Sequence, residues 1–309
     1  MLIIEAIEQF KFHCKYEKNL DPNTLRAYNI DITQFSSELS NYKLTNIDKN
    51  HLKKYIENLY NCKYKIKTIK RKIAVVKAFF NFLEFEDIIT VNPFRKMRLS
   101  LKEPKILPIT LDIKEIEIIL KHIQEKAKYS INKPNIYKHI LKDLVVIEIL
   151  FSTGMRVSEL SNLTKKDINV KTGSIKIFGK GSKERIIHIC DNRILTIIKE
   201  YIRLFDIKNH ESTYFLINKI DKRMSEQSIR LMIKRYRQEI AFSKHITPHT
   251  FRHTFATLLL EEGVDIRYIQ TMLGHSAITT TQIYTKVSSE HQRKILKAKH
   301  PRKKIKILL

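Results

Sequence analysis

Apolar residues in the first third of the chain recur at intervals of three and four, the spacing that places them on one face of a helix. One such stretch contains Leu25, Tyr28, Ile32, Phe35 and Leu39. A second contains Ile66, Ile69, Ile73, Val76, Phe80 and Leu83. Residues 1–97 are therefore predicted to form helices only and to bury their apolar faces against one another in a first domain.

A basic stretch with two prolines follows this helical block. Residues 98–110 contain Pro104 and Pro108, and proline biases its neighbours towards extended backbone. This range is predicted to be a linker. A second domain, residues 111–290, is expected to open with an amphipathic helix, to loop out over the polar residues 126–138, and to continue with an apolar helix over 141–152.

One segment of the second domain has the alternation of strands. SIKIF (174–178) and ERIIHI (184–189) alternate apolar and polar residues and are joined by GKGSK (179–183). This pattern predicts a β-hairpin. Helices are expected to resume after Asp191 and to run to the end, so the fold class is mainly α with a small β element.

The charge balance indicates a polyanionic partner. The 309 residues include 58 Lys and Arg against 32 Asp and Glu, a formal net charge of +26. Nucleic acid is the first choice and an anionic membrane surface the second. The densest apolar run, residues 144–151, contains Glu148 and is too short to span a bilayer, so no membrane association is expected.

A run of bases on the second periodic helix is a candidate contact with this polyanion. No acidic residue interrupts the sequence from Lys63 to Lys77. Such a run can be a solvated face or a surface that contacts phosphates, and the overall charge favours the second. The predicted outer face carries Lys65, Lys67, Lys70, Arg71, Lys72 and Lys77.

The sequence favours a cytoplasmic location. The N-terminal residues lack the early basic region of a signal peptide. The three cysteines are far apart, and none forms a C-x-x-C pair. This distribution indicates a reducing compartment rather than a disulfide framework.

The segment TPHTFRHTFAT (247–257) has an unusual distribution of charge for a helix start. Thr247 is a good N-cap and Pro248 suits the first helical position. His249, Arg252 and His253 then fall near the positive end of the helix dipole, where cations are disfavoured. An anion bound among these side chains would make their positive charge favourable at this end of the helix. The two histidines could instead ligate a metal, but no third ligand accompanies them at motif spacing.

Three further segments carry groups that suit a phosphate, although each has an ordinary structural explanation when taken alone. Arg156 could form a surface ion pair with Glu159, and Lys180 could be an ordinary turn lysine. Tyr284 is one of 13 tyrosines, most of which are expected to be structural. The segments are TGMRVSEL, GKGSKER and LGHSAITTTQIYTKV.

In this order, the four segments resemble the tyrosine site-specific recombinases, most closely the chromosome dimer resolvases of the XerC/XerD type. The resemblance extends over nearly the whole chain, through NTLRAYNIDITQF, KAFFNFL, LPITL and the terminal HPR. It implies an N-terminal four-helix, SAM-like core-binding domain and a mostly α catalytic domain. It also implies a catalytic set made of Arg156, Lys180, His249, Arg252, His275 and Tyr284.

The resemblance implies a role for each member of this set. Tyr284 attacks a scissile phosphate, and the cationic residues stabilise the negative charge of the transition state. His249 is the candidate base, Lys180 the candidate proton donor to the leaving oxygen, and Glu159 orients Arg156. The expected product is a 3′-phosphotyrosyl intermediate, formed without metal, cofactor or ATP.

The resemblance also implies partners. Double-stranded DNA is expected, in a homo-tetramer or a hetero-tetramer with a paralogous recombinase on two sites. A septal DNA translocase is a further candidate partner, and the cytoplasmic protein is expected to associate with the nucleoid. In the tail, residues 291–309, Ile295 and Ala298 form only a thin apolar stripe, so this helix is not expected to be stable alone. It could be a frayed basic end that contacts DNA, whereas the resemblance favours docking on a neighbouring subunit.

Three alternatives remain open at this point. The chain could resolve chromosome dimers at a dif-like site, or it could be the integrase of a mobile element. It could also be a DNA-binding protein of the same fold that does not cleave. The segment 126–138 is longer than the resemblance leads us to expect, and its role is open.

Overall fold

The computed structural model describes residues 3–39, 43–95, 97–102, 107–179, 184–207, 209, 211–274 and 289–305. Lys180, His275 and Tyr284 lie outside these ranges. The chain folds into two compact units, Met1–Ile106 and Leu107–Leu309. The division falls inside the range predicted for the linker, and the exact predicted boundaries stay predictions.

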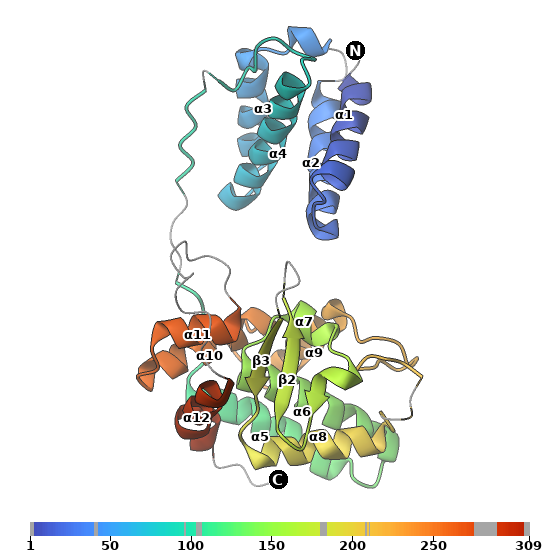
Figure 1. Ribbon diagram of the computed structural model, residues 1–309, viewed down its shortest axis with the longest axis vertical. Coiled ribbons are helices and arrows are strands. Elements are labelled where there is room, and N and C mark those ends of the chain that lie inside the picture. The colour runs from blue at the N-terminus through green and yellow to red at the C-terminus, as the bar shows by residue number, and fades with distance from the viewer. Residues whose placement is uncertain are drawn as a thin grey trace. The chain divides into compact units, whose positions relative to one another are not determined.

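The N-terminal unit contains four α-helices among its described residues, which agrees with the predicted four-helix domain (Figure 1). Helix α4 packs against each of the other three. A short π-helical turn, His13–Glu17, extends the first helix, and a 3₁₀ turn, Leu44–Asn46, precedes the third. The helices are α1 (Ile3–Phe12), α2 (Pro22–Glu38), α3 (Lys49–Asn61) and α4 (Ile66–Phe85).

The predicted apolar faces of α2 and α4 form the core of this unit. Phe35 and Phe80 are fully buried, and Phe35 meets Tyr55 of α3 edge to face, with 4.9 Å between ring centroids. The prediction was wrong for Lys72, which is 3% exposed instead of lying on the outer face. Its ammonium group bonds to the buried Asp31 carboxylate at 3.1 Å, because the helical period turns position 72 towards α2.

The C-terminal unit is also mainly helical, with one small sheet. Its helices are α5 (Ile113–Tyr129), α6 (Pro134–Thr153), α7 (Val157–Ser161), α8 (Asn192–Leu204), α9 (Glu226–Glu239), α10 (Pro248–Glu261), α11 (Ile266–Leu273) and α12 (Ser289–Lys299). The antiparallel sheet has the order β1 (Ile168–Asn169), β2 (Ser174–Phe178) and β3 (Glu184–His188). The described residues of this unit also form 3₁₀ turns at Lys165–Asp167 and Pro301–Lys304.

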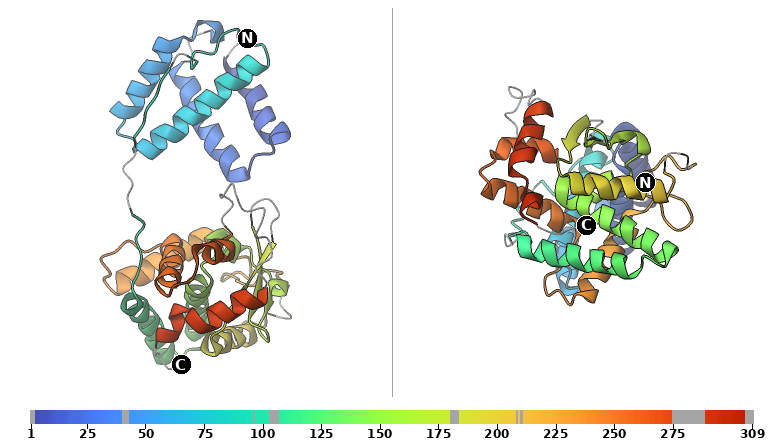
Figure 2. Two further views of the ribbon diagram at one scale, coloured as in Figure 1. Left: turned by 60° about the vertical axis from the view of Figure 1, so that its left-hand side comes forward. Right: turned by 90° about the horizontal axis from the view of Figure 1, so that it is seen from below.

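Helix α6 is the centre of this unit, and α5, α8 and α10 each pack on it (Figure 2). Every residue from 140 to 153 is buried. The helix ends at Gly154, which has a left-handed φ of +59°. A Cβ at this position would come within 2.6 Å of Phe255 and 2.8 Å of Leu273. Gly154 therefore allows the end of α6 to lie against the middle of α10 and the end of α11.

The predicted loop over residues 126–138 is wrong in extent. Helix α5 continues to Tyr129 and α6 already begins at Pro134, so only residues 130–133 form a turn. Pro134 occupies a first-turn position, where its missing N–H costs nothing. Tyr137 packs against the core and donates a hydrogen bond to Glu200 at 2.8 Å, so the segment is polar but still amphipathic.

The predicted hairpin is confirmed. Strands β2 and β3 pair antiparallel, with Ile175 opposite Ile187 and Ile177 opposite Arg185. The expectation that helices follow without interruption is only partly met. Between α8 and α9 the chain forms turns and two isolated bridges, one joining Thr164 to Tyr214 and one joining Ile217 to Arg223.

The tail packs on the C-terminal unit of its own chain. Helix α12 lies beside β3 (Figure 1). Its buried apolar residue is Leu296, 1% exposed, and Ala298 faces solvent. The terminal turn buries Arg302 and Ile305 completely. Docking of the tail on a neighbouring subunit stays a prediction.

Within the part of the chain that the structure describes, no helix combines the length and apolarity needed to cross a membrane.

Candidate functional site

Arg156 lies directly after the turn that ends α6, at the N-cap of α7. The Glu159 carboxylate accepts a hydrogen bond from the Arg156 backbone N–H at 2.8 Å, as in a capping box. It also accepts from the Arg156 guanidinium at 3.0 Å. The Glu159 side chain is 6% exposed and that of Arg156 is 37% exposed. Glu159 therefore fixes both the backbone and the side chain of Arg156.

Arg252 reaches the same place from α10. The predicted start of this helix is confirmed, because the Thr247 hydroxyl accepts the Thr250 N–H at 3.3 Å and Pro248 follows the cap. Arg252 is 6% exposed. Its guanidinium donates to the carbonyls of Gly154 and Leu273, each at 2.7 Å. Arg252 is thus held by backbone at the junction of α6 and α11.

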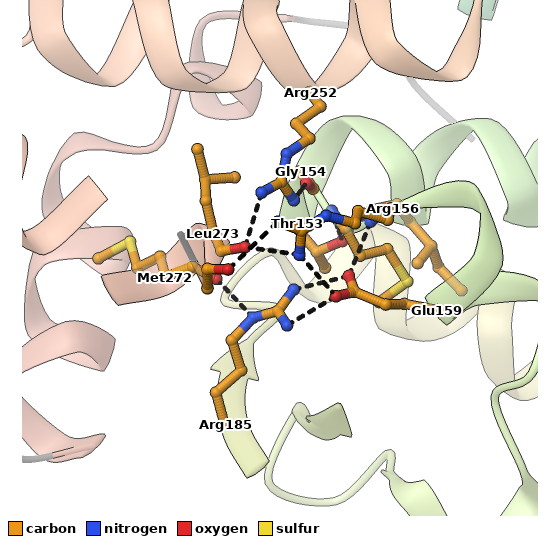
Figure 3. Close-up of polar contacts among 11 residues, drawn as sticks. Thr153, Gly154, Arg156, Glu159, Arg185, Arg252, Met272 and Leu273 are labelled. Carbon is orange, nitrogen blue, oxygen red and sulfur yellow. Dashed lines mark hydrogen bonds and ion pairs between the residues drawn. The ribbon is translucent and has the colours of Figure 1, made fainter. Parts of the chain in front are cut away.

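The two arginines converge at the C-terminal end of α11 (Figure 3). Arg156 donates to the carbonyl of Gly274 at 3.2 Å and approaches that of Leu273 at 3.5 Å. Gly274 caps the helix with a left-handed φ of +64°. In the sequence, His275 follows Gly274 directly. The geometry therefore brings Arg156 and Arg252 together at the residue before His275.

The electrostatics of this cluster favour an added anion. Burial and, to a smaller extent, the positive charge of Arg156 lower the pKa of Arg252 to about 10, although the charge of Glu159 acts in the opposite direction. Among the described residues, no carboxylate lies within ion-pair distance of Arg252. An anion placed beside it would stabilise the charged guanidinium and raise its pKa again.

Glu159 stays ionised in the cluster. Burial by itself would raise the pKa of this carboxyl, but hydrogen bonds from Arg185 and Arg156 and the charges of both guanidiniums lower it. The carboxylate therefore remains an acceptor over the whole neutral range.

His249 lies one helical turn before Arg252 and is exposed. Partial burial lowers the pKa of its imidazole, and the neighbouring His253 and Arg252 lower it as well. The neutral form can accept a proton at neutral pH, as a general base must. His253 is also exposed, and among the described residues no group of three His, Cys, Asp or Glu side chains is placed to hold a metal.

Arg185 is part of this cluster and was not among the predicted site residues. It lies on β3 and forms two hydrogen bonds with Glu159, at 2.9 and 2.7 Å. The strand alternation contains the signal that could have identified it. Arg185 is two positions before the buried Ile187 and so shares its inward face.

The predicted DNA-contacting residues of the N-terminal unit differ in their surroundings. Lys65, Lys67 and Lys77 are exposed, and Lys70 is half-buried. Arg71 is exposed but forms an ion pair with the buried Asp31. Part of its charge is therefore already neutralised within the domain.

Comparison with known proteins assigns the class. Residues 110–291 match the model of the phage integrase family, and residues 7–87 match that of the phage integrase N-terminal SAM-like domain. The first match covers more than half of the chain. The chain therefore belongs to the phage integrase family, the tyrosine recombinases.

Curated relatives place it more narrowly, with the XerC/XerD type. A tyrosine recombinase of Agathobacter rectalis is 46% identical over 298 residues, 96% of each chain. The tyrosine recombinase XerD of Staphylococcus epidermidis is 35% identical over 301 residues, which cover 96% of this chain and 98% of the relative.

A solved structure supports the fold. The XerH site-specific recombinase bound to its difH substrate, in a pre-cleavage complex, superimposes with a TM-score of 0.67. Its sequence is 22% identical, and the match covers 91% of this chain and 80% of the other. This likeness concerns the fold alone.

Proposed function

We propose that this recombinase cleaves and rejoins duplex DNA through attack of Tyr284 on a scissile phosphate. The observation that carries the proposal is the convergence of Arg156 and Arg252, the second of them buried without a carboxylate partner in the described structure. Two guanidiniums at one point can donate several hydrogen bonds to the oxygens of a phosphate. Glu159 offsets only part of their charge.

The proposed step conserves bonds and charge. The bond from the Tyr284 oxygen to phosphorus forms as the bond to the 5′ oxygen of the next nucleotide breaks. His249 takes the phenolic proton, directly or through a relay, and Lys180 gives a proton to the leaving oxygen. The 3′-phosphotyrosyl bond keeps the energy of the original linkage. The 5′ hydroxyl freed in a partner duplex can therefore attack this phosphorus, which forms a new phosphodiester and releases Tyr284. His275 would add a further donor to the phosphate.

Replacement of the nucleophile tests this proposal. The Tyr284→Phe variant should bind its DNA site with unchanged affinity and form no covalent adduct, because only the hydroxyl is lost. Denaturing gel electrophoresis of labelled DNA after incubation with each protein measures the adduct. Persistence of the adduct in this variant would show that another residue attacks.

A sulfur-containing substrate tests the proton donor separately. Lys180→Ala should slow cleavage of normal DNA but not of DNA with a 5′-bridging phosphorothioate, since sulfur leaves without a proton. Lys183→Ala is the matched control in the same turn. Rescue of the control variant instead of Lys180→Ala would assign the role to Lys183.

The biological role we propose is resolution of chromosome dimers at a dif-like site in the nucleoid. Similarity to the XerD recombinase over nearly the whole of both chains supports this role over that of a mobile-element integrase. The XerH relative was solved on a difH substrate. Sequencing the DNA that is covalently trapped on the protein in cells would decide between the two roles.

The assembly we propose is a tetramer on two DNA duplexes, either of identical chains or with a paralogue. A tail exchanged around a closed ring would join its subunits. Deleting residues 291–309 should then weaken cooperative binding to two-arm sites more than binding to one-arm sites, as measured by gel-shift titration.

Contact between α4 and the DNA backbone completes the proposal. The exposed Lys65, Lys67 and Lys77 are the best placed of the predicted residues, with Lys70 and the partly neutralised Arg71 beside them. Each lysine that contacts a phosphate should contribute about −0.9 to the slope of log K against log salt. Lys67→Ala should remove about one such contact and make the slope less steep by about 0.9.

A further inference from the structure

Arg185 occupies the side of the cluster opposite Arg252 (Figure 3). Its side chain is 11% exposed. One guanidinium nitrogen donates to each oxygen of Glu159, at 2.9 and 2.7 Å, and Nε donates to the carbonyl of Met272 at 2.8 Å. Each of the three guanidinium nitrogens thus donates one hydrogen bond, two to Glu159 and one to the end of α11.

Three arginines share three consecutive carbonyls at the end of α11. Arg185 binds that of Met272, Arg252 that of Leu273, and Arg156 that of Gly274. The C-terminal end of a helix carries partial negative charge, which favours cations there. The three side chains come from β3, α10 and the start of α7, so together they fix where α11 ends.

The second link is Glu159, which Arg185 and Arg156 share. Each oxygen of the carboxylate accepts one hydrogen bond from Arg185 and one from Arg156, the latter through the guanidinium and the backbone N–H. Three guanidiniums and one carboxylate leave two positive charges in the cluster. Without Arg185, the whole of the Glu159 charge would act on Arg156 alone.

We infer that Arg185 is a positioning residue of the recombination reaction: it divides the Glu159 carboxylate between two arginines and so keeps Arg156 aimed at the phosphate. This inference rests on the proposed function. Arg185 also ties the base of the β2–β3 hairpin, five residues after Lys180 in the sequence, to the segment that leads into His275. One side chain therefore connects the hairpin, Glu159 and the end of α11.

The test uses the full-length protein and a duplex with a nick near the scissile phosphate, so that cleavage is not reversed. Arg185→Lys keeps the charge but loses the fork, and Arg185→Met loses both. We expect either variant to bind DNA within about twofold of the parent and to form the covalent adduct about 10²-fold more slowly, the cost of a small misplacement. Lys176→Met is the matched control, since it removes an exposed ion pair of the same hairpin.

A double variant distinguishes positioning from a general effect on folding. In Arg185→Met, the carboxylate of Glu159 is free to draw Arg156 away from the phosphate. Adding Glu159→Gln removes that charge, so the double variant should cleave about tenfold faster than Arg185→Met. Loss of stability alone would instead make the double variant equal or slower. Either that result, or parental cleavage by Arg185→Lys, would overturn the inference.

The parent and Tyr284→Phe are run on the same substrate. A Tyr284-dependent adduct in the parent, with cleavage unaffected by the Arg185 variants, would refute the positioning role and leave the proposed function standing. No adduct in the parent would refute both.

Discussion

Arg252 and Arg302 are the two arginines that the described structure buries almost completely, and they are held in opposite ways. Arg302 is 0% exposed and meets the equally buried Glu148 in a forked ion pair, with contacts from 2.7 to 3.2 Å. Arg252 is 6% exposed and bonds to two backbone carbonyls. One charge is neutralised within the protein, and the other is left available.

This difference separates a structural arginine from a functional one. A buried charge is costly unless it is paired. Arg302 meets that requirement internally and attaches the tail to α6. In the described part of the chain, Arg252 has only two backbone carbonyls as partners, and the proposed DNA phosphate would supply the negative charge that pairs with it. The comparison suggests where substitutions should affect folding and where they should affect cleavage.

The largest effect is expected from Arg302→Ala. This change leaves the Glu148 carboxylate buried and unpaired, so the free energy of unfolding should fall by about 3–5 kcal/mol. Denaturant titration measures it. Lys304→Ala, which removes an exposed ion pair of the same tail with Glu262, is the control and should cost at most about 1 kcal/mol. Equal losses in the two variants would break the comparison.

Arg252→Lys should have the next largest effect, and on cleavage. Loss of the guanidinium fork should slow adduct formation about 10²–10³-fold, the range for one transition-state donor. Stability should fall by only about 1 kcal/mol, because lysine can still bond to one carbonyl. Parallel unfolding and single-turnover experiments give both values. A variant that cleaves normally but unfolds easily would place Arg252 with Arg302 as a structural residue.

A smaller effect is expected from pH, through His300. Its neutral ring accepts the Arg302 N–H and bonds to the Ser152 carbonyl, each at 3.0 Å. Burial lowers the pKa of this imidazole to about 4. The unfolded chain takes up a proton below about pH 6.5 and the folded one does not, so stability is complete above that pH and falls as pH decreases towards 4.

The variant His300→Gln isolates this contribution. At pH 5 the parent should have lost about 2 kcal/mol through His300 relative to pH 7, and the variant should lack that loss. His249 and His188, whose pKa values are also lowered, remain in both proteins and cancel in the difference. Identical pH profiles of the parent and the variant would contradict the assignment.

The smallest effect is expected from replacing the whole ion pair. Glu148→Leu combined with Arg302→Met leaves no buried charge at this site, so the double variant should lie within about 1 kcal/mol of the parent. Unfolding of the double and both single variants forms a thermodynamic cycle. A double variant as unstable as Arg302→Ala would mean that the shape of the pair matters more than its charge.

Elements with a clear local pattern could be predicted from the sequence. Helix α4 and both strands of the hairpin lie where periodicity placed them, and α10 begins at the predicted Thr247–Pro248 cap. The predictions are wrong where polar residues occupy positions on the core-facing side of a helix and so interrupt its apolar pattern. Residues 126–138 are mostly helical, and Lys72 points inward, because a polar side chain can occupy a core-facing position when a partner such as Asp31 is there.

The sequence by itself determined the class of protein, the order of the candidate catalytic residues and the strong positive charge, since all three are properties of residue types and their spacing. Tertiary structure alone decided which charged side chains form ion pairs within the protein. Arg302 and Glu148 are 154 positions apart, and Arg185 is 26 positions from Glu159. No local pattern encodes such pairs, because a guanidinium finds its partner only when packing brings distant elements together.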